Sequence, residues 1–151
     1  MGTVSDVARQ RFIDAPPEVV WKLIADVDRH PEWWPRIVEV HCEGLEEGCT
    51  YREVVKAGPR EQELEVRVDE MEDCENLVIR CINTGTFVHF SLTPARGGTF
   101  IDGRMGMDPK GAGNKVFDLL LGQRYFRNWL EQTVEALDAA ACRRAGEREA
   151  A

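Results

Sequence analysis

The sequence has no apolar run that approaches the roughly 20 residues needed to span a bilayer. Near its start, no basic stretch is followed by an apolar one, so we find no secretory signal. We therefore expect a cytoplasmic protein without an integral membrane segment. Acidic side chains outnumber basic ones and give a formal charge of −8. Because such a chain repels phosphate backbones, nucleic acid is not an expected partner.

The chain also lacks the residue spacing of a metal or disulfide site. Its histidines, at positions 30, 41 and 89, lie far apart and form no pair with zinc-ligand spacing. The cysteines are odd in number and none has C-x-x-C spacing, which in a cytoplasmic protein indicates free thiols. They are Cys42, Cys49, Cys74, Cys81 and Cys142. We expect no bound metal.

Catalytic sequence motifs are absent as well. The chain has no G-x-S-x-G motif, no paired carboxylates and no Cys–His signature. It has no glycine-rich phosphate cradle either, and Gly111 and Gly113 read as a flexible lead-in to a helix. We therefore predict no catalytic residues and no cofactor.

The composition is typical of a globular protein, with 43% apolar and 30% charged residues, and a length of 151 residues corresponds to one domain. Residues 4–13 predict an edge strand, and Pro16 and Pro17 suit the first turn of a short helix. Pro31 and Pro35 bracket a second, single-turn element. The apolar stripe of the first helix has 3.6-residue spacing and consists of Val20, Leu23, Ile24 and Val27.

The middle of the chain predicts consecutive antiparallel strands. Leu64, Val66 and Val68 alternate with charged residues, as in a half-buried strand. A turn that pairs Asn83 with Thr86 would place Cys81 opposite Val88, Ile79 opposite Phe90 and Leu77 opposite Leu92. A second turn that pairs Pro94 with Thr99 would place Leu92 opposite Ile101, Phe90 opposite Gly103 and Val88 opposite Met105. Both turns choose the same apolar face, and they put Arg80, His89 and Arg104 in a row on the other.

A long helix is predicted from about Asn114 to Cys142, followed by a charged, frayed tail over residues 144–151. We therefore place a single domain at residues 1–143. The first half of the helix is apolar nearly all round, so it must cover something on a second side. The main apolar stripe consists of Val116, Leu119, Leu120, Phe126, Leu130, Val134, Leu137 and Ala141, and the second of Phe117, Leu121, Tyr125 and Trp129.

Several of these segments resemble a known superfamily. The run from Ile13 to Trp21 (IDAPPEVVW), the segment Pro31–Pro35 (PEWWP) and Gly97-Gly98-Thr99 before the last strand are similar to the START-like (Bet v 1-like, SRPBCC) proteins. Within them, the chain is nearest in style to the polyketide cyclase/dehydrase and lipid-transport family. The resemblance implies an α+β helix-grip fold. In that fold a curved seven-stranded antiparallel sheet wraps around a long C-terminal helix, with two short helices after the first strand.

The resemblance also implies a cavity between the sheet and the last helix. Combined with the predicted inner face, it gives these candidate lining residues: Trp34, Val66, Val68, Ile79, Cys81, Val88, Phe90, Gly103, Met105, Met107, Phe117, Leu120, Leu121 and Arg124. Gly103 leaves space opposite Phe90, and Arg124 is either a surface charge or a contact at the cavity mouth. Glu53 is undecided, since more than one pairing of its strand is possible. His89 and Arg104 face outward unless the register slips by one residue.

Three functions fit these features. The first is a carrier or sensor that binds a small hydrophobic or amphipathic molecule, such as a lipid, a quinone or a polyketide-like compound. The second is an aromatase/cyclase that acts on a poly-β-ketone chain, which an inward Glu53, His89 or Arg104 would favour. The third is a protein-interaction module that uses the Phe117–Trp129 stripe. The sequence is compatible with a monomer or a homodimer.

Overall fold

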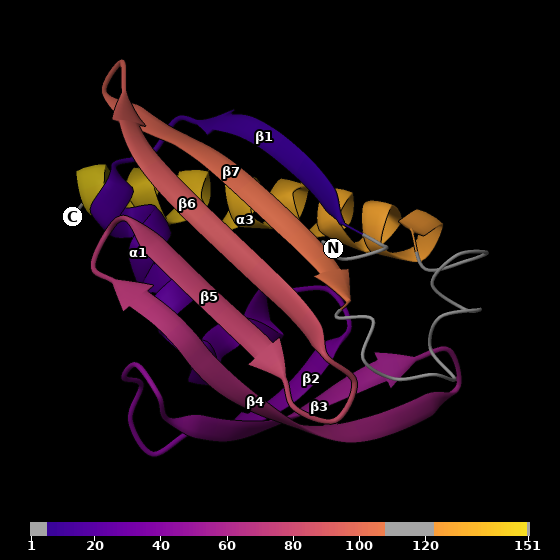
Figure 1. The fold of residues 1–151 in the computed structure, drawn as a ribbon. Coiled ribbons are helices and arrows are strands. Elements are labelled where there is room, and N and C mark those ends of the chain that lie inside the picture. Colours follow the sequence, from indigo (N-terminus) through magenta and orange to yellow (C-terminus); the bar gives the residue numbers. More distant parts are fainter. Residues whose placement is uncertain (1–5, 108–122, 151) are drawn as a thin grey trace.

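A computed structural model describes residues 6–107 and 123–150. Seven strands form one antiparallel sheet in the order β1-β7-β6-β5-β4-β3-β2, which curves around a long helix (Figure 1). The strands are β1 (Val7–Ile13), β2 (Ile37–His41), β3 (Thr50–Ala57), β4 (Arg60–Glu72), β5 (Asn76–Cys81), β6 (Thr86–Ala95) and β7 (Gly98–Met107). This is the predicted helix-grip fold, and the first strand lies at a sheet edge as expected.

Two short helical elements connect β1 to β2: α1 (Pro17–Ala25) and the 3₁₀ helix η1 (Val27–Glu32). The stripe predicted for this segment is buried. His30 is fully buried, and its Nε2 donates to the Ile24 carbonyl oxygen at 2.7 Å. Trp33 donates through Nε1 to the Leu23 carbonyl oxygen at 3.2 Å. These two bonds tie the second element to the end of the first.

The long helix α3 (Gln123–Ala150) lies behind the sheet across β1 and β7 in Figure 1. The described part of its main stripe is buried, which confirms the predicted core face: Phe126, Leu130, Val134, Leu137 and Ala141. The helix runs beyond the expected end at Cys142. Ala145 is partly buried against the core, and alanine, arginine and glutamate all favour helix there. No helix among the described residues combines the length and apolarity needed to cross a membrane.

The predicted strand registers are partly correct. The β6–β7 pairing is confirmed, with Phe90 opposite Gly103. The β5–β6 register is wrong by two residues, since Ile79 pairs with Val88 rather than Phe90. The connecting turn is wider than predicted: the Gly85 amide donates to the Cys81 carbonyl oxygen at 2.8 Å, and the Asn83 side chain accepts a hydrogen bond from the Glu65 amide of β4 at 2.9 Å. A shift of two keeps every side chain on its predicted face.

Candidate functional site

An apolar cavity of about 270 Å³ lies between the curved sheet and the first described turns of α3. Its walls come from β2 to β7, from the segment after η1, and from α3. The lining residues are Trp34, Ile37, Glu53, Val55, Gln62, Leu64, Val66, Ile79, Cys81, Thr84, Thr86, Val88, Met107, Tyr125, Phe126 and Trp129. An apolar space of this kind favours a ligand whose binding removes its walls from water.

Glu53 is the acidic residue of this cavity wall. Strand β3 alternates so that Tyr51, Glu53 and Val55 are buried while Arg52 and Lys56 are exposed. Glu53 is 8% exposed, and its Oε2 has no hydrogen-bond partner among the described residues. Burial raises the pKa of Glu53 from 4.5 to about 7, because an apolar environment disfavours the charged carboxylate. The carboxyl is therefore poised between its neutral and charged forms near neutral pH.

Tyr51 lies two residues before Glu53 on the same face of β3. Its hydroxyl is buried and has no partner among the residues that the structure places. Burial, together with the nearby Glu53 carboxyl, raises the pKa of Tyr51 well above its usual value. The tyrosine is thus a neutral neighbour of Glu53 and not a charge that would compensate it.

Aromatic side chains form the wall nearest α3. Trp34 is 3% exposed, and its ring packs edge-on against Phe90 with centroids 5.5 Å apart. Trp129 is fixed by a 3.0 Å hydrogen bond from its Nε1 to the Pro35 carbonyl oxygen. The Arg36 guanidinium covers Tyr125 and Trp129, at 4.8 and 5.6 Å from their ring centroids. The second helix stripe therefore turns under the segment around Trp34.

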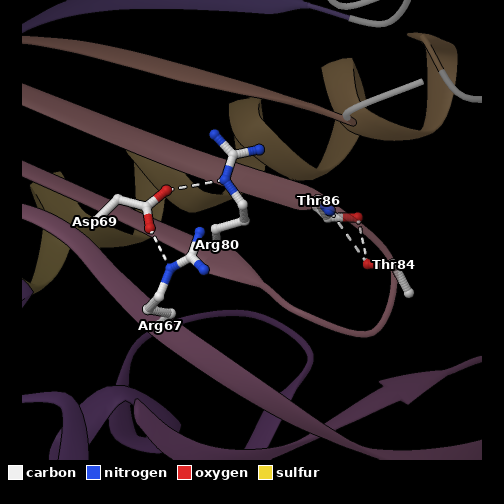
Figure 2. A network of polar contacts seen from close by, with 5 residues as sticks. All are labelled: Arg67, Asp69, Arg80, Thr84 and Thr86. Carbon is white, nitrogen blue, oxygen red and sulfur yellow. Dashed lines mark hydrogen bonds and ion pairs between the residues drawn. The ribbon is translucent and has the colours of Figure 1, made fainter. Parts of the chain in front are cut away.

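Two threonine hydroxyls in the cavity wall are hydrogen-bonded to each other. The Thr84 and Thr86 hydroxyls hydrogen-bond each other at 2.9 Å, and the Thr86 amide also donates to the Thr84 hydroxyl at 3.2 Å (Figure 2). Gln62 is exposed. Trp34 differs from these groups, because its Nε1 is buried and has no partner among the described residues. Among the described residues that line the cavity, the buried polar atoms without a hydrogen-bond partner are Glu53 Oε2 and Trp34 Nε1.

The outer face of the sheet carries the other charged candidates. His89 pairs with Arg104 across β6 and β7, and its side chain contacts Asn76 and Ser91. Arg104 lies 3.8 Å from the Asp102 carboxylate. Both candidates are therefore on the surface face, as predicted for the unslipped register.

Arg80 is also on the outer face but lies opposite Phe87 rather than His89, as a result of the two-residue shift. Asp69 accepts hydrogen bonds from Arg67 at 2.6 Å and from Arg80 at 2.9 Å, with α3 behind the sheet in Figure 2. These side chains form a solvated polar network across β4 and β5. They do not reach the cavity.

The structure brings together part of the predicted lining set. The following line the cavity: Trp34, Val66, Ile79, Cys81, Val88 and Met107. The following are buried in the packed core around it: Val68, Phe90, Gly103 and Met105. Arg124 is exposed on α3. Three further predicted positions, Phe117, Leu120 and Leu121, lie outside the described residues. Ligand contact by any of these residues stays a prediction.

Gly103 does not open the cavity in the way the sequence suggested. A Cβ at this position would lie 3.3 Å from Leu130 Cδ1 and 3.5 Å from Val134 Cγ2. The space opposite Phe90 is therefore filled by α3. The glycine permits close contact between α3 and β7. The core is therefore packed at β7, away from the β3 strand that carries Glu53.

Sequence reasoning missed or left open the part of the lining that β2 and β3 supply. Ile37 and Val55 line the cavity and pair with each other across the two strands. The β3–β4 turn pairs Ala57 with Arg60, and this register fixes Glu53 inward opposite Leu64. The alternation of Tyr51, Glu53 and Val55 carries the signal. The inward direction of Glu53 can be predicted from this alternation only when the position of the β3–β4 turn is known.

A wider depression of about 1060 Å³ lies beside the β2–β3 hairpin. Its lining is largely polar and includes Asp28, His41, Glu43, Glu46 and Arg52. All five cysteines are free thiols, and Cys42 and Cys49 border this depression. Because its walls offer little apolar surface, it provides less binding energy for an apolar ligand than the inner cavity.

Residues 5–141 match the sequence profile of the family described as "Polyketide cyclase / dehydrase and lipid transport". The chain belongs to this family. The match agrees with the architecture, in which a helix and a curved sheet enclose an apolar space. No curated protein matches the chain significantly.

Solved structures share the family fold. The protein TTHA0849 from Thermus thermophilus aligns with a TM-score of 0.74 at 16% identity, over 93% of this chain and 99% of that one. The di-domain ARO/CYC StfQ from the steffimycin biosynthetic pathway gives 0.72 at 18% identity over 97% of this chain. The alignment covers 52% of StfQ, so the chain spans about half of that protein. Ara h 8.0201 gives 0.68 at 13% identity, over 91% and 97% of the two chains.

Proposed function

We propose that this protein binds one small, mainly apolar molecule in the cavity between the sheet and α3, as a carrier or sensor. The observation that carries the proposal is the cavity itself, where aliphatic and aromatic side chains surround the only carboxyl group among the described lining residues. Release of water from such walls on ligand binding supplies the affinity.

The size of the cavity supports a compact ligand. An engineered apolar cavity of about 150 Å³ accommodates benzene. The present cavity of about 270 Å³ therefore suits a molecule of about two fused rings or a short chain. The family description, which includes lipid transport, is compatible with this use.

A second candidate function is favoured by Glu53. In an aldol cyclisation, a base takes a proton from the methylene between two ketones. The resulting carbanion forms a carbon–carbon bond to another carbonyl carbon of the same chain, and the proton returns to that carbonyl's oxygen. A buried carboxyl with a pKa of about 7 suits both proton transfers near neutral pH. StfQ bears the designation ARO/CYC, and a cyclase role for this chain remains second because its cavity is small for an extended polyketone.

The interaction-module hypothesis receives less support. Its test is whether the second helix stripe forms a bare apolar patch. Of that stripe, the described residues Tyr125 and Trp129 line the cavity beneath Arg36, and Trp129 is 8% exposed. A stripe that turns inward supports a pocket more than a docking surface.

Native mass spectrometry of protein purified without detergent tests for a resident ligand. We expect a stoichiometric small molecule that is released on denaturation and can be identified after solvent extraction. Its chemistry would separate a lipid from an aromatic compound. Purified protein that is bare and also fails to bind added naphthalene would contradict the proposal.

A matched pair of variants tests the location of binding. Cys81 and Ile82 are adjacent at the end of β5, but Cys81 lines the cavity while Ile82 is 46% exposed. Cys81→Phe should fill part of the cavity and abolish calorimetric binding of naphthalene. Ile82→Phe, which adds a ring outside the cavity, should bind naphthalene like the wild type. Thermal unfolding of both variants checks that the fold survives, since overpacking costs about 1–3 kcal/mol. Equal binding by the two variants would place the ligand elsewhere.

A further inference from the structure

The polar composition of the cavity wall restricts the chemistry of its ligand. Glu53 contributes a buried carboxyl whose Oε2 has no hydrogen-bond partner among the described residues. Such a group costs free energy in the empty protein, because an unmet buried acceptor or donor loses its bonds to water. A ligand that bonds to it recovers this cost.

No cationic side chain of the described structure forms an ion pair with Glu53. Arg36, beside the aromatic wall of the cavity, has its guanidinium over Tyr125 and Trp129. Within the described part of the chain, the carboxyl is therefore not the acidic half of a salt bridge. It is available as a hydrogen-bonding group toward the cavity.

Trp34 provides a second, independent constraint. It lines the same cavity, and its buried Nε1–H, which can only donate, has no acceptor among the residues described. A cationic ligand group would only donate and would leave this N–H unmet. A hydroxyl oxygen can accept one hydrogen bond while its proton is donated to a carboxyl oxygen.

We propose that Glu53 is the polar contact for an uncharged hydroxyl group on an otherwise apolar ligand, so that the cavity selects phenols or alcohols over hydrocarbons and amines of the same size. This inference rests on the proposed function and specifies its ligand class. A neutral partner fits the state of Glu53, because burial in apolar surroundings disfavours the carboxylate near neutral pH. Once bound, the hydroxyl supplies the hydrogen bond that the buried Glu53 carboxyl lacks in the empty cavity.

Three probes of equal ring system test the proposal by calorimetry at pH 7: naphthalene, 2-naphthol and cationic 2-naphthylmethylamine. We expect 2-naphthol to bind the wild type about tenfold more tightly than naphthalene, as one additional buried hydrogen bond provides. The amine should bind most weakly. Glu53→Leu should remove the preference for 2-naphthol and retain naphthalene binding. Glu53→Gln, whose amide oxygen still accepts a hydrogen bond, should restore part of the preference.

The outcomes distinguish this inference from the proposed function. If naphthalene and 2-naphthol bind equally and Glu53→Leu changes neither, the hydroxyl inference is wrong while the apolar cavity stands. Tightest binding of the amine would also overturn it, in favour of a cationic ligand. If no probe binds the wild type, the proposed function fails with it. Circular dichroism and thermal unfolding confirm that each variant is folded, and Glu53→Leu should be at least as stable as the wild type because it removes an unmet buried carboxyl.

Discussion

At the scale of single residues, the protonation state of Glu53 sets the chemistry of the cavity and its dependence on pH. Its carboxyl is buried without a compensating charge, and this burial raises its pKa to about 7. In the unfolded chain the same group ionises near 4.5. Between these two values the folded protein holds a proton that the unfolded chain has released, so the folded state becomes less stable as pH rises.

Glu53→Gln should remove this loss of stability. We expect the free energy of unfolding of the wild type to fall relative to that of Glu53→Gln as pH rises from about 4.5 to about 7 and to level off above the folded-state pKa. The total change is about 3 kcal/mol, since one pKa unit corresponds to about 1.4 kcal/mol. Urea unfolding at several pH values measures it. A difference that is constant with pH would show that Glu53 ionises normally in the folded protein.

His30 acts in the opposite direction and makes the comparison with the variant necessary. Full burial lowers the pKa of His30 from 6.5 to about 4, although its hydrogen bond to the Ile24 carbonyl partly opposes the shift. Here the unfolded chain binds the extra proton, so stability falls as pH drops below about 6.5. This effect is common to the wild type and Glu53→Gln and cancels in their difference.

At the scale of elements, the closeness of α3 to β7 depends on Gly103. Because a Cβ there would lie 3.3 Å from Leu130 Cδ1, Gly103→Ala should force a small displacement of the helix side chain and cost about 1 kcal/mol. Gly146, on the exposed side of α3, has no atom within 4 Å of an added Cβ, and Gly146→Ala should instead stabilise the protein by up to about 1 kcal/mol. Chemical denaturation of the two variants measures both effects. Stabilisation by both substitutions would mean that β7 and α3 are less tightly packed than described.

The elements also show how far the sequence could predict this structure. Strand alternation predicts the inner face of the sheet, and the apolar stripe that ends at Ala141 predicts the buried face of the helix. Both predictions succeed because the spacing of apolar residues determines which side of an element is buried. The β5–β6 register could not be predicted, since the turn between these strands contacts β4 through Asn83 and the Glu65 amide, which are distant in sequence. The inward direction of Glu53 depends likewise on the β3–β4 turn. The sequence predicts free space at Gly103, because no sequence pattern reveals how closely a helix and a strand approach each other.

At the scale of the whole molecule, the sheet and helix pack tightly at one end and leave a cavity at the other. Gly103 permits close contact between α3 and β7. At the other end, the segment from Trp34 to Ile37 and strands β2–β4 form the part of the cavity wall that contains Glu53. The sequence anticipated this architecture and part of the cavity lining, but not the lining residues that β2 and β3 supply. The family match and the shared fold leave the ligand to be determined from the cavity's own chemistry.

The most direct test of the cavity as a binding site uses the four tryptophans, at positions 21, 33, 34 and 129. Trp34 and Trp129 line the cavity, whereas Trp21 does not. In a ¹H–¹⁵N NMR titration with naphthalene, we predict that the indole N–H signals of Trp34 and Trp129 shift in a saturable manner while that of Trp21 stays in place. Absence of any saturable shift, or a shift of Trp21 without Trp34 and Trp129, would contradict the account.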